Sequence, residues 1–331
     1  MSTSRRRFRP AGLLTGGLGI VAMVGCAAAA WSSGDVPGAV WSARGAPAVV
    51  SGGTWRTAEE VPGTAALNKR GNAEILSVSC ASPGSCSGGG SYRDGSRHDQ
   101  AFVVNETNGT WRTAMEVPGT AGLNTSGSAE ILSVSCTSAG NCAAGGFYQD
   151  GSFNAQALIV NEINGIWRTA EEVPGTAALN TGGDAVVRSV LCASEGNCAA
   201  GGSYWGRFGH DQAFVVSETN GVWGTAEEVP GTAALNTGGA AETAAVSCTS
   251  AGNCSAGGEY TDSTQNGQAF VVNETNRTWR TAEEVPGTAA LNAGGGGATL
   301  SVSCASASSC SAGGQYLDSH FGQQAFVDNK T

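Results

Sequence analysis

The chain has 331 residues, a net charge of −10 at pH 7, 40% hydrophobic content, 51 glycines and only 13% charged residues. The acidic balance argues against nucleic acid or an anionic membrane as the main partner, because phosphate binding needs clustered Lys and Arg. This glycine-rich composition favours a folded, turn-rich β protein over a disordered chain.

Residues 1–30 predict an export signal of bacterial type. Residues 4–9 are basic, and residues 11–25 form an apolar run that is short for a membrane span. The string SRRRF resembles a twin-arginine signal, so export by the Sec or the twin-arginine route is expected. Two cleavage outcomes stay open: Cys26 follows a lipobox-like sequence and becomes the lipid-bearing N-terminus, or cleavage within 27–30 removes it. The protein is therefore expected to be secreted or anchored at the cell surface, and to contact a membrane only through a lipid on Cys26.

Residues 31–51 predict a linker, and residues 52–331 contain five copies of one 56-residue unit. A tryptophan marks each copy at Trp55, Trp111, Trp167, Trp223 and Trp279. A fixed period of this length indicates a solenoid, an array or a propeller, which forms one continuous body.

Four antiparallel strands are predicted in each unit. In the first full copy, residues 74–80 alternate in polarity, residues 86–92 can run back, and residues 100–106 are β-branched and aromatic. An Asn-Gly turn at 108–109 then leads to a fourth strand over 111–117, stopped by Pro118. Four antiparallel strands in a unit of this size are typical of a propeller blade.

The two ends of the repeat predict that the blades close into a ring. The first copy opens with an isolated fourth strand at 54–61, and the last copy ends after its third strand at 324–329. Pairing these segments removes two exposed sheet edges. The predicted fold is therefore an all-β, five-bladed β-propeller closed by an N-terminal strand that pairs with the C-terminal blade.

Ten of the eleven cysteines form five pairs with a constant spacing. The predicted disulfides are Cys80–Cys86, Cys136–Cys142, Cys192–Cys198, Cys248–Cys254 and Cys304–Cys310. An exported chain would oxidise such pairs. Zinc is the rival interpretation, but no second Cys or His pair accompanies the first, so no metal site is predicted.

The strings SVSC, GNC, AGG, QAFVVNE and WRTAEEVPGTAALN resemble secreted actinobacterial repeat proteins that have no assigned activity. This resemblance covers residues 52–331 and implies an exported, propeller-like protein without implying a reaction. The turn before Trp111 also resembles the Asp-box hairpin of sialidases, but it lacks the Asp and one residue of the spacing. A five-bladed ring is similar to some animal lectins by fold analogy alone.

The non-repeating residues lie between the second and third strands, on the face that also carries the connections to the next blade. Variable loops on a rigid scaffold are where binding usually occurs. Aromatic rings there could stack on sugars, and Asp could accept hydroxyl hydrogen bonds; alternatively, the Asp residues only shape turns. The predicted ligand-binding residues are Tyr92, Asp94, Tyr148, Asp150, Tyr204, Trp205, Tyr260, Asp262, Tyr316 and Asp318. Arg188 replaces a leucine of the innermost strand and is expected to reach the centre of the ring.

These features predict a monomeric, non-enzymatic binding or surface module that recognises glycan or cell-wall polymer through repeated weak sites on one face. No catalytic residue and no cofactor is predicted, because the conspicuous acids occur as adjacent Glu pairs on strands, and such neighbours point to opposite faces. Two alternatives remain: a degenerate sialidase-like or glycoside-hydrolase-like propeller, which needs a unique carboxylate cluster near the axis, and a purely structural repeat protein.

Overall fold

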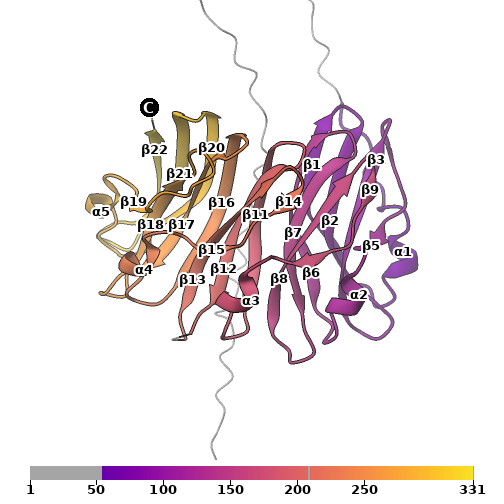
Figure 1. Cartoon of the computed structure of the whole chain (residues 1–331), viewed down its shortest axis with the longest axis horizontal. Coiled ribbons are helices and arrows are strands. Elements are labelled where there is room, and N and C mark those ends of the chain that lie inside the picture. The colour runs from indigo at the N-terminus through magenta and orange to yellow at the C-terminus, as the bar shows by residue number, and fades with distance from the viewer. Residues whose placement is uncertain (1–53, 208, 331) are drawn as a thin grey trace, which may run out of the picture. The chain divides into compact units, whose positions relative to one another are not determined.

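Each repeat folds into an antiparallel sheet whose main strands follow one another along the chain (Figure 1). The computed structural model describes residues 54–207 and 209–330, and residues 58–331 belong to one compact unit. The predicted export signal, the linker and Cys26 lie outside the described residues. The all-β prediction is confirmed, and the arrangement of sheets is propeller-like.

The first sheet contains β1 (Ala73–Ser82), β2 (Ser85–Arg93), β3 (Asp99–Thr107), β4 (Thr110–Trp111) and β5 (Met115–Glu116). The second contains β6 (Ala129–Ser138), β7 (Asn141–Gln149), β8 (Ala155–Ile163), β9 (Ile166–Trp167) and β10 (Glu171–Glu172). The third contains β11 (Ala185–Ser194), β12 (Asn197–Trp205), β13 (Asp211–Thr219), β14 (Val222–Trp223) and β15 (Glu227–Glu228). The fourth contains β16 (Ala241–Ser250), β17 (Asn253–Thr261), β18 (Gly267–Asn273) and β19 (Glu283–Glu284). The fifth contains β20 (Ala298–Ser306), β21 (Ser309–Leu317) and β22 (Gln323–Lys330).

The predicted fourth strand is broken in the middle. The N–H of Arg112 and that of Val117 both donate to the third strand of the same sheet, at Asn105 and Ala101. Between them, the N–H of Ala114 donates instead to Pro62 O of the preceding unit, at 2.7 Å. The segment therefore leaves its own sheet to join consecutive units, which a strand pattern could not reveal.

A single helical turn follows each broken strand and was not predicted. The turns are α1 (Thr64–Leu67), α2 (Thr120–Leu123), α3 (Thr176–Leu179), α4 (Thr232–Leu235) and α5 (Thr288–Leu291). Each begins after a glycine with positive φ, such as Gly119 at 91°, where a side chain is disfavoured. Asn124 at the C-terminal end donates to Asp99 O and to Gln100, and so fastens the connection to the third strand.

The five predicted disulfides are confirmed, and each closes the hairpin between the first two strands of its sheet. The structure also explains why the second residue of each Gly pair is glycine. A Cβ on Gly146 would collide with Glu130 O on the paired strand, so only glycine permits this approach.

The innermost strands β1, β6, β11, β16 and β20 pack in series, and the hydrophobic core fills the spaces between consecutive sheets. Phe102, Phe214 and Phe270 are fully buried there, as expected for the third-strand column. The predicted closure is not observed. Residues 54–61 form no strand, and among the described residues β22 pairs only with β21.

Within the described part of the chain, no helix has the length and apolarity needed to cross a membrane.

Candidate functional site

The loops between the second and third strands lie beside the connections that lead to the next sheet. The N–H of Asp99 donates to Gly127 O at 3.0 Å, and the N–H of Ala155 donates to Gly183 O at the same distance. We call this end of the molecule the loop face. It comprises the second-to-third-strand loops at 94–98, 150–154, 206–207, 209–210, 262–266 and 318–322, together with the connections 125–128, 181–184, 237–240 and 293–297. The expectation that both sets of segments share one face is confirmed.

The loop aspartates hold their own turns. Asp94 Oδ1 accepts hydrogen bonds from the N–H groups of Ser96 and His98 at 2.8 and 2.9 Å, and Oδ2 accepts one from Gln100. The same pattern recurs at Asp150, Asp262 and Asp318. Burial alone would raise the pKa of Asp262, but these bonds outweigh it and lower the pKa to about 2. This geometry matches the turn-shaping alternative, while their contact with a ligand stays a prediction.

The predicted tyrosines point into the protein. Tyr92, Tyr148, Tyr204 and Tyr260 are at most 5% exposed, and each hydroxyl donates to a glutamate of the same sheet. Burial, followed by the nearby Glu172 carboxylate, raises the pKa of Tyr148 to about 12. Tyr316 in the last sheet is half-buried. As placed, the four buried rings support the loop face from beneath, and their sugar-binding role stays a prediction.

The fourth position of each loop adopts a left-handed backbone conformation. It is occupied by Arg97, Phe153, Gly209, Gln265 and Phe321, with φ between 59° and 76°. Gly209 is the residue that this geometry favours, whereas a bulky side chain there is strained by roughly 1–3 kcal/mol. Nevertheless, Phe153 and Phe321 occupy it and expose 71% and 74% of their surface. These two rings are therefore held on strained turns without being buried.

Trp205 adds a third exposed aromatic ring to the loop face. It is 41% exposed and packs over Gly182 of the adjacent connection, which fixes its orientation. His98 and His210 lie against Gly127 and Gly239 in the same manner. Among the described residues, no group of three or more His, Cys, Asp or Glu side chains could hold a metal ion.

An acidic group surrounds Arg188 where the inner strands begin, at the loop face. Arg188 Nε lies 3.0 Å from Glu242 Oε2 of the next sheet, and Ser203 donates to the same oxygen. Burial raises the pKa values of Glu130, Asp184 and Asp211, and for Asp211 the neighbouring Asp184 and Glu242 carboxylates raise it further. Glu130 and Glu242 belong to one column of the repeat, which also contains Glu74 and in which Val186 and Ala298 are the exceptions. Asp184, in contrast, has no acidic equivalent in any other unit.

Sequence reasoning singled out Arg188 but missed the acids around it. The available signal was that Asp184 and Arg188 depart from the repeat, because no other unit has an acid at the position of Asp184 or a base at that of Arg188. However, the distance between these acidic side chains and Arg188 depends on how consecutive sheets pack, and the 56-residue period does not determine it.

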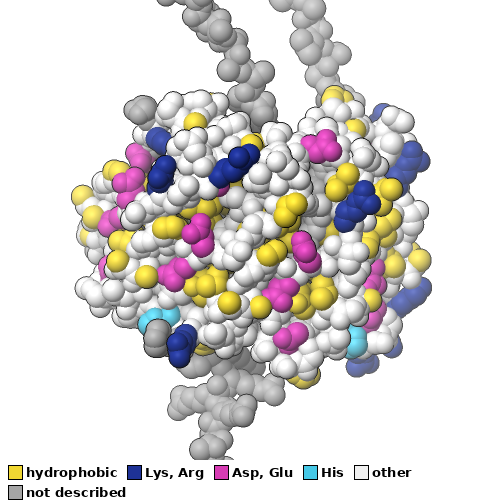
Figure 2. Space-filling view, viewed as in Figure 1, with side chains coloured by type: hydrophobic (Ala, Val, Ile, Leu, Met, Phe, Trp, Pro, Cys, Tyr) yellow, Lys and Arg dark blue, Asp and Glu magenta, His cyan; other side chains and the backbone are white. Residues whose placement is uncertain are grey.

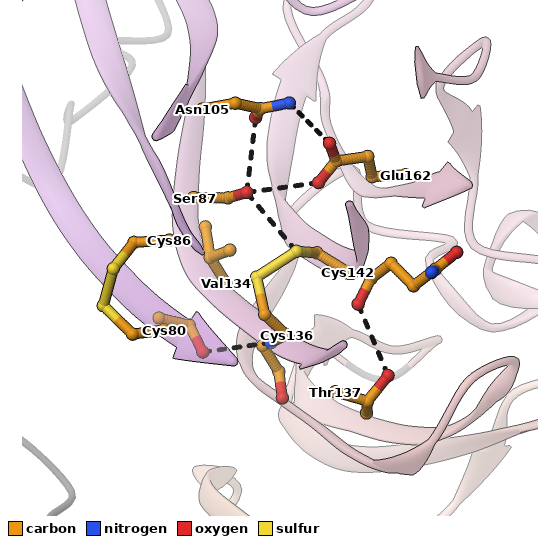
Figure 3. The surroundings of a disulfide bond; sticks show 12 residues. Cys80, Cys86, Ser87, Asn105, Val134, Cys136, Thr137, Cys142 and Glu162 are labelled. Carbon is orange, nitrogen blue, oxygen red and sulfur yellow. Dashed lines mark hydrogen bonds between the residues drawn. A yellow bond between two sulfur atoms is a disulfide. The ribbon is translucent and has the colours of Figure 1, made fainter. Parts of the chain in front are cut away.

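Two clefts lie at the opposite end, beside the disulfides. One of about 340 Å³ separates the first two sheets, and another of about 420 Å³ separates the second and third. Their polar lining includes Glu162, which accepts hydrogen bonds from Ser87 and Asn105 of the preceding sheet (Figure 3). Glu162 is only 2% exposed, and its carboxylate is satisfied by these partners. These clefts are therefore gaps within a repeated structural junction.

On the face shown in Figure 2, acidic and basic side chains are dispersed and form no broad patch of one sign.

No protein-family model matches the sequence, and neither does any curated protein. Among solved structures, the chain is similar to a Hadza microbial sialidase, Hz136, with a TM-score of 0.46 and 13% identity over 77% of this chain. The matched part spans 56% of that sialidase. It is also similar to a protein of unknown function from Dyadobacter fermentans (TM-score 0.43, 11% identity, 80% of this chain and 81% of that one). A thermostable family-43 glycoside hydrolase gives a TM-score of 0.40 and 10% identity over 80% of this chain and 92% of that one. Similarity at this level carries no inference about activity.

Proposed function

We propose that the chain is an exported, non-enzymatic binding protein that recognises glycan or cell-wall polymer through the loop face. The observation that carries this proposal is the exposure of Phe153 and Phe321 at backbone positions that favour glycine. Rigid aromatic rings on fixed turns contribute apolar contact at little entropic cost, and sugar rings present flat apolar faces to them.

Repetition of the exposed rings compensates for the weak affinity expected at each single site. A single exposed ring supports only weak binding, but several on one scaffold act together on a polymer that repeats the same sugar. Trp205 belongs to the same set because its ring is exposed at the same end.

Export is part of the proposal, although it does not rest on the loop face. Five disulfides in a single chain require an oxidising compartment, which supports passage out of the cytoplasm. The basic and apolar stretches within residues 1–30 support the same route, with or without a lipid on Cys26.

The test compares loop variants in pull-down from purified bacterial cell walls and on a glycan array. Replacing both Phe153 and Phe321 with Gly should weaken binding about tenfold or more, since each aromatic contact contributes about 1 kcal/mol. Gln265→Gly is the matched control, because it relieves the same backbone strain without removing a ring.

Thermal stability separates loss of contact from loss of fold. Both glycine variants should melt at the same temperature as the unmodified protein or higher, since glycine fits the left-handed turn. Absence of binding to every glycan by the unmodified protein would rule out the proposal.

A second candidate is hydrolysis of a glycosidic bond by the acids around Arg188. The specific observation is that Asp184 and Arg188 depart from the repeat, because a reaction needs a group that occurs once, in one place. Raised pKa values at Glu130 and Asp184 fit a general acid.

Chromogenic glycosides and intact cell-wall polymer are the substrates to test. If this candidate is correct, Asp184→Asn and Glu242→Gln should each lower turnover at least about a hundredfold, while Asp328→Asn, on the distant outer strand β22, should not. The absence of turnover on all substrates would remove it and leave the binding proposal intact.

A further inference from the structure

The junctions between consecutive sheets use one set of contacts, with a serine at six of the eight accepting positions. Leu191 at the third junction and Ala245 at the fourth replace the other two. Serines of one inner strand accept hydrogen bonds from backbone N–H groups of the next inner strand. The pairs are Ser77 with Val134, Ser79 with Cys136, Ser133 with Val190, Ser135 with Cys192, Ser189 with Val246 and Ser247 with Cys304, at 2.9–3.1 Å. Each sheet thus offers serine oxygens on one side and backbone donors on the other.

A glycine column completes the apolar part of the junction. Side chains of the next inner strand occupy the space that a Cβ would take: Ile131 over Gly89, Val187 over Gly145, Thr243 over Gly201 and Thr299 over Gly257. A side chain on any of these glycines would collide with the following sheet.

Tryptophan and glutamate complete the polar part. The indole N–H of Trp167 donates to Asn105 of the preceding sheet at 2.8 Å, and that of Trp223 donates to Asn161 at 3.2 Å. The amides of the same two asparagines donate to Glu162 and Glu218.

The fifth sheet has an intact serine side, and among the described residues no sheet packs against it. Ser301, Ser303 and Asn329 occupy the accepting positions, and Gly313 keeps the glycine column. A Cβ on Gly313 would meet nothing nearer than Phe326 O of its own sheet at 3.6 Å. Val327 beside it is 82% exposed.

The first sheet has the complementary side, also uncovered. Val78 is 52% exposed, whereas the equivalent valines Val134, Val190, Val246 and Val302 are at most 6% exposed. The first sheet also carries three residues whose equivalents meet the preceding sheet at the first three internal junctions. They are Ile75, Glu106 and Trp111, and all three are only half-buried.

We propose that these two end faces join copies of this chain head to tail. Ile75 and Val78 of one copy would pack on Gly313 of the next, while Val78 N–H and Cys80 N–H donate to Ser301 and Ser303. Trp111 would donate to Asn329, which in turn donates to Glu106. The interface continues the inner-strand and glycine contacts of the four internal junctions and the Trp–Asn–Glu contacts of the first two, and an end repeat without a polar cap is open to such stacking. The inference is independent of glycan binding and replaces the predicted monomer.

Two substitutions block one face each. Gly313→Leu fills the open column of the fifth sheet, and Val78→Arg places a charge on the first sheet. We expect the unmodified protein to show a mass that rises above that of one chain with increasing concentration in light scattering after size exclusion. Each variant alone should remain a single chain, with an unchanged melting temperature and circular dichroism spectrum.

Mixing the two variants makes the test specific. The Gly313→Leu chain keeps its first-sheet face and the Val78→Arg chain keeps its fifth-sheet face, so together they should form a dimer that does not grow further. Ser319→Leu, on an exposed loop, is the control and should associate like the unmodified protein. A single-chain mass at every concentration, as closure within one chain would give, overturns the proposal; so does association that both variants leave unchanged.

Discussion

At the scale of single residues, the buried glutamates of the junctions link stability to pH. Glu218 is 3% exposed and accepts one hydrogen bond from the preceding sheet, and burial raises its pKa. A carboxyl with a raised pKa in the folded state binds its proton more tightly there than in the unfolded chain. Its contribution to stability is therefore complete below the unfolded pKa and is lost as pH rises through the folded one.

We expect Glu218→Gln to remove this dependence. Gln can still accept the hydrogen bond from Asn161 but never carries a buried charge. Relative to the unmodified protein, the variant should gain stability between pH 4 and pH 7, by about 1 kcal/mol, the usual scale of single substitutions. Urea unfolding at several pH values measures it.

Glu106 in the first sheet provides the matched control. It occupies the same column but is only half-buried, so it keeps more of its hydration. Glu106→Gln should change the pH dependence less than Glu218→Gln. An equal effect of both substitutions would show that burial in the junction is not the cause.

At the scale of elements, the disulfides stabilise the hairpins that begin each sheet. The Cys136–Cys142 bond closes a hairpin between β6 and β7, whose register is already fixed by backbone pairing. A loop this short loses little entropy on closure, so the bond should contribute only about 2 kcal/mol.

Replacing Cys136 and Cys142 with Ala should therefore lower the free energy of unfolding by about 2 kcal/mol without preventing folding. Denaturant unfolding under oxidising conditions measures the change. Under full reduction of the disulfides, the unmodified protein and the variant should converge, since both then lack this bond. A difference that persists under reduction would mean that packing of the sulfur atoms, not loop closure, provides the stability.

Elements also show where reasoning from sequence succeeds. The period, the alternation and the paired cysteines predict the first three strands, the Asn-Gly hairpin and the disulfides, because these depend on contacts close in the chain. The fourth strand is predicted as continuous because nothing local shows that Ala114 bonds to Pro62 of the preceding unit. Short helical turns were missed for the same reason: four residues give no helical period to detect.

At the scale of the whole molecule, some features of the candidate site could be predicted from the sequence and others could not. The sequence places Trp205 and the variable loops on one face, and the structure agrees. It could not show that the tyrosines point inward or that Phe153 holds a left-handed backbone, since both depend on the three-dimensional turn. Closure by residues 54–61 was inferred because the repeat starts on a fourth strand and ends on a third. This shows that the two ends of the repeat are complementary, but it does not show which partner each end contacts.

The serine-to-amide contacts have a consequence for how such a gene changes length. Each 56-residue unit carries both sides of the junction, one for the unit before it and one for the unit after it. An unequal crossover that inserts or deletes a whole unit therefore leaves the surviving neighbours matched. The number of repeats can then change by recombination without a new hydrophobic core having to evolve. The loops can diverge in sequence while the scaffold that carries them is kept.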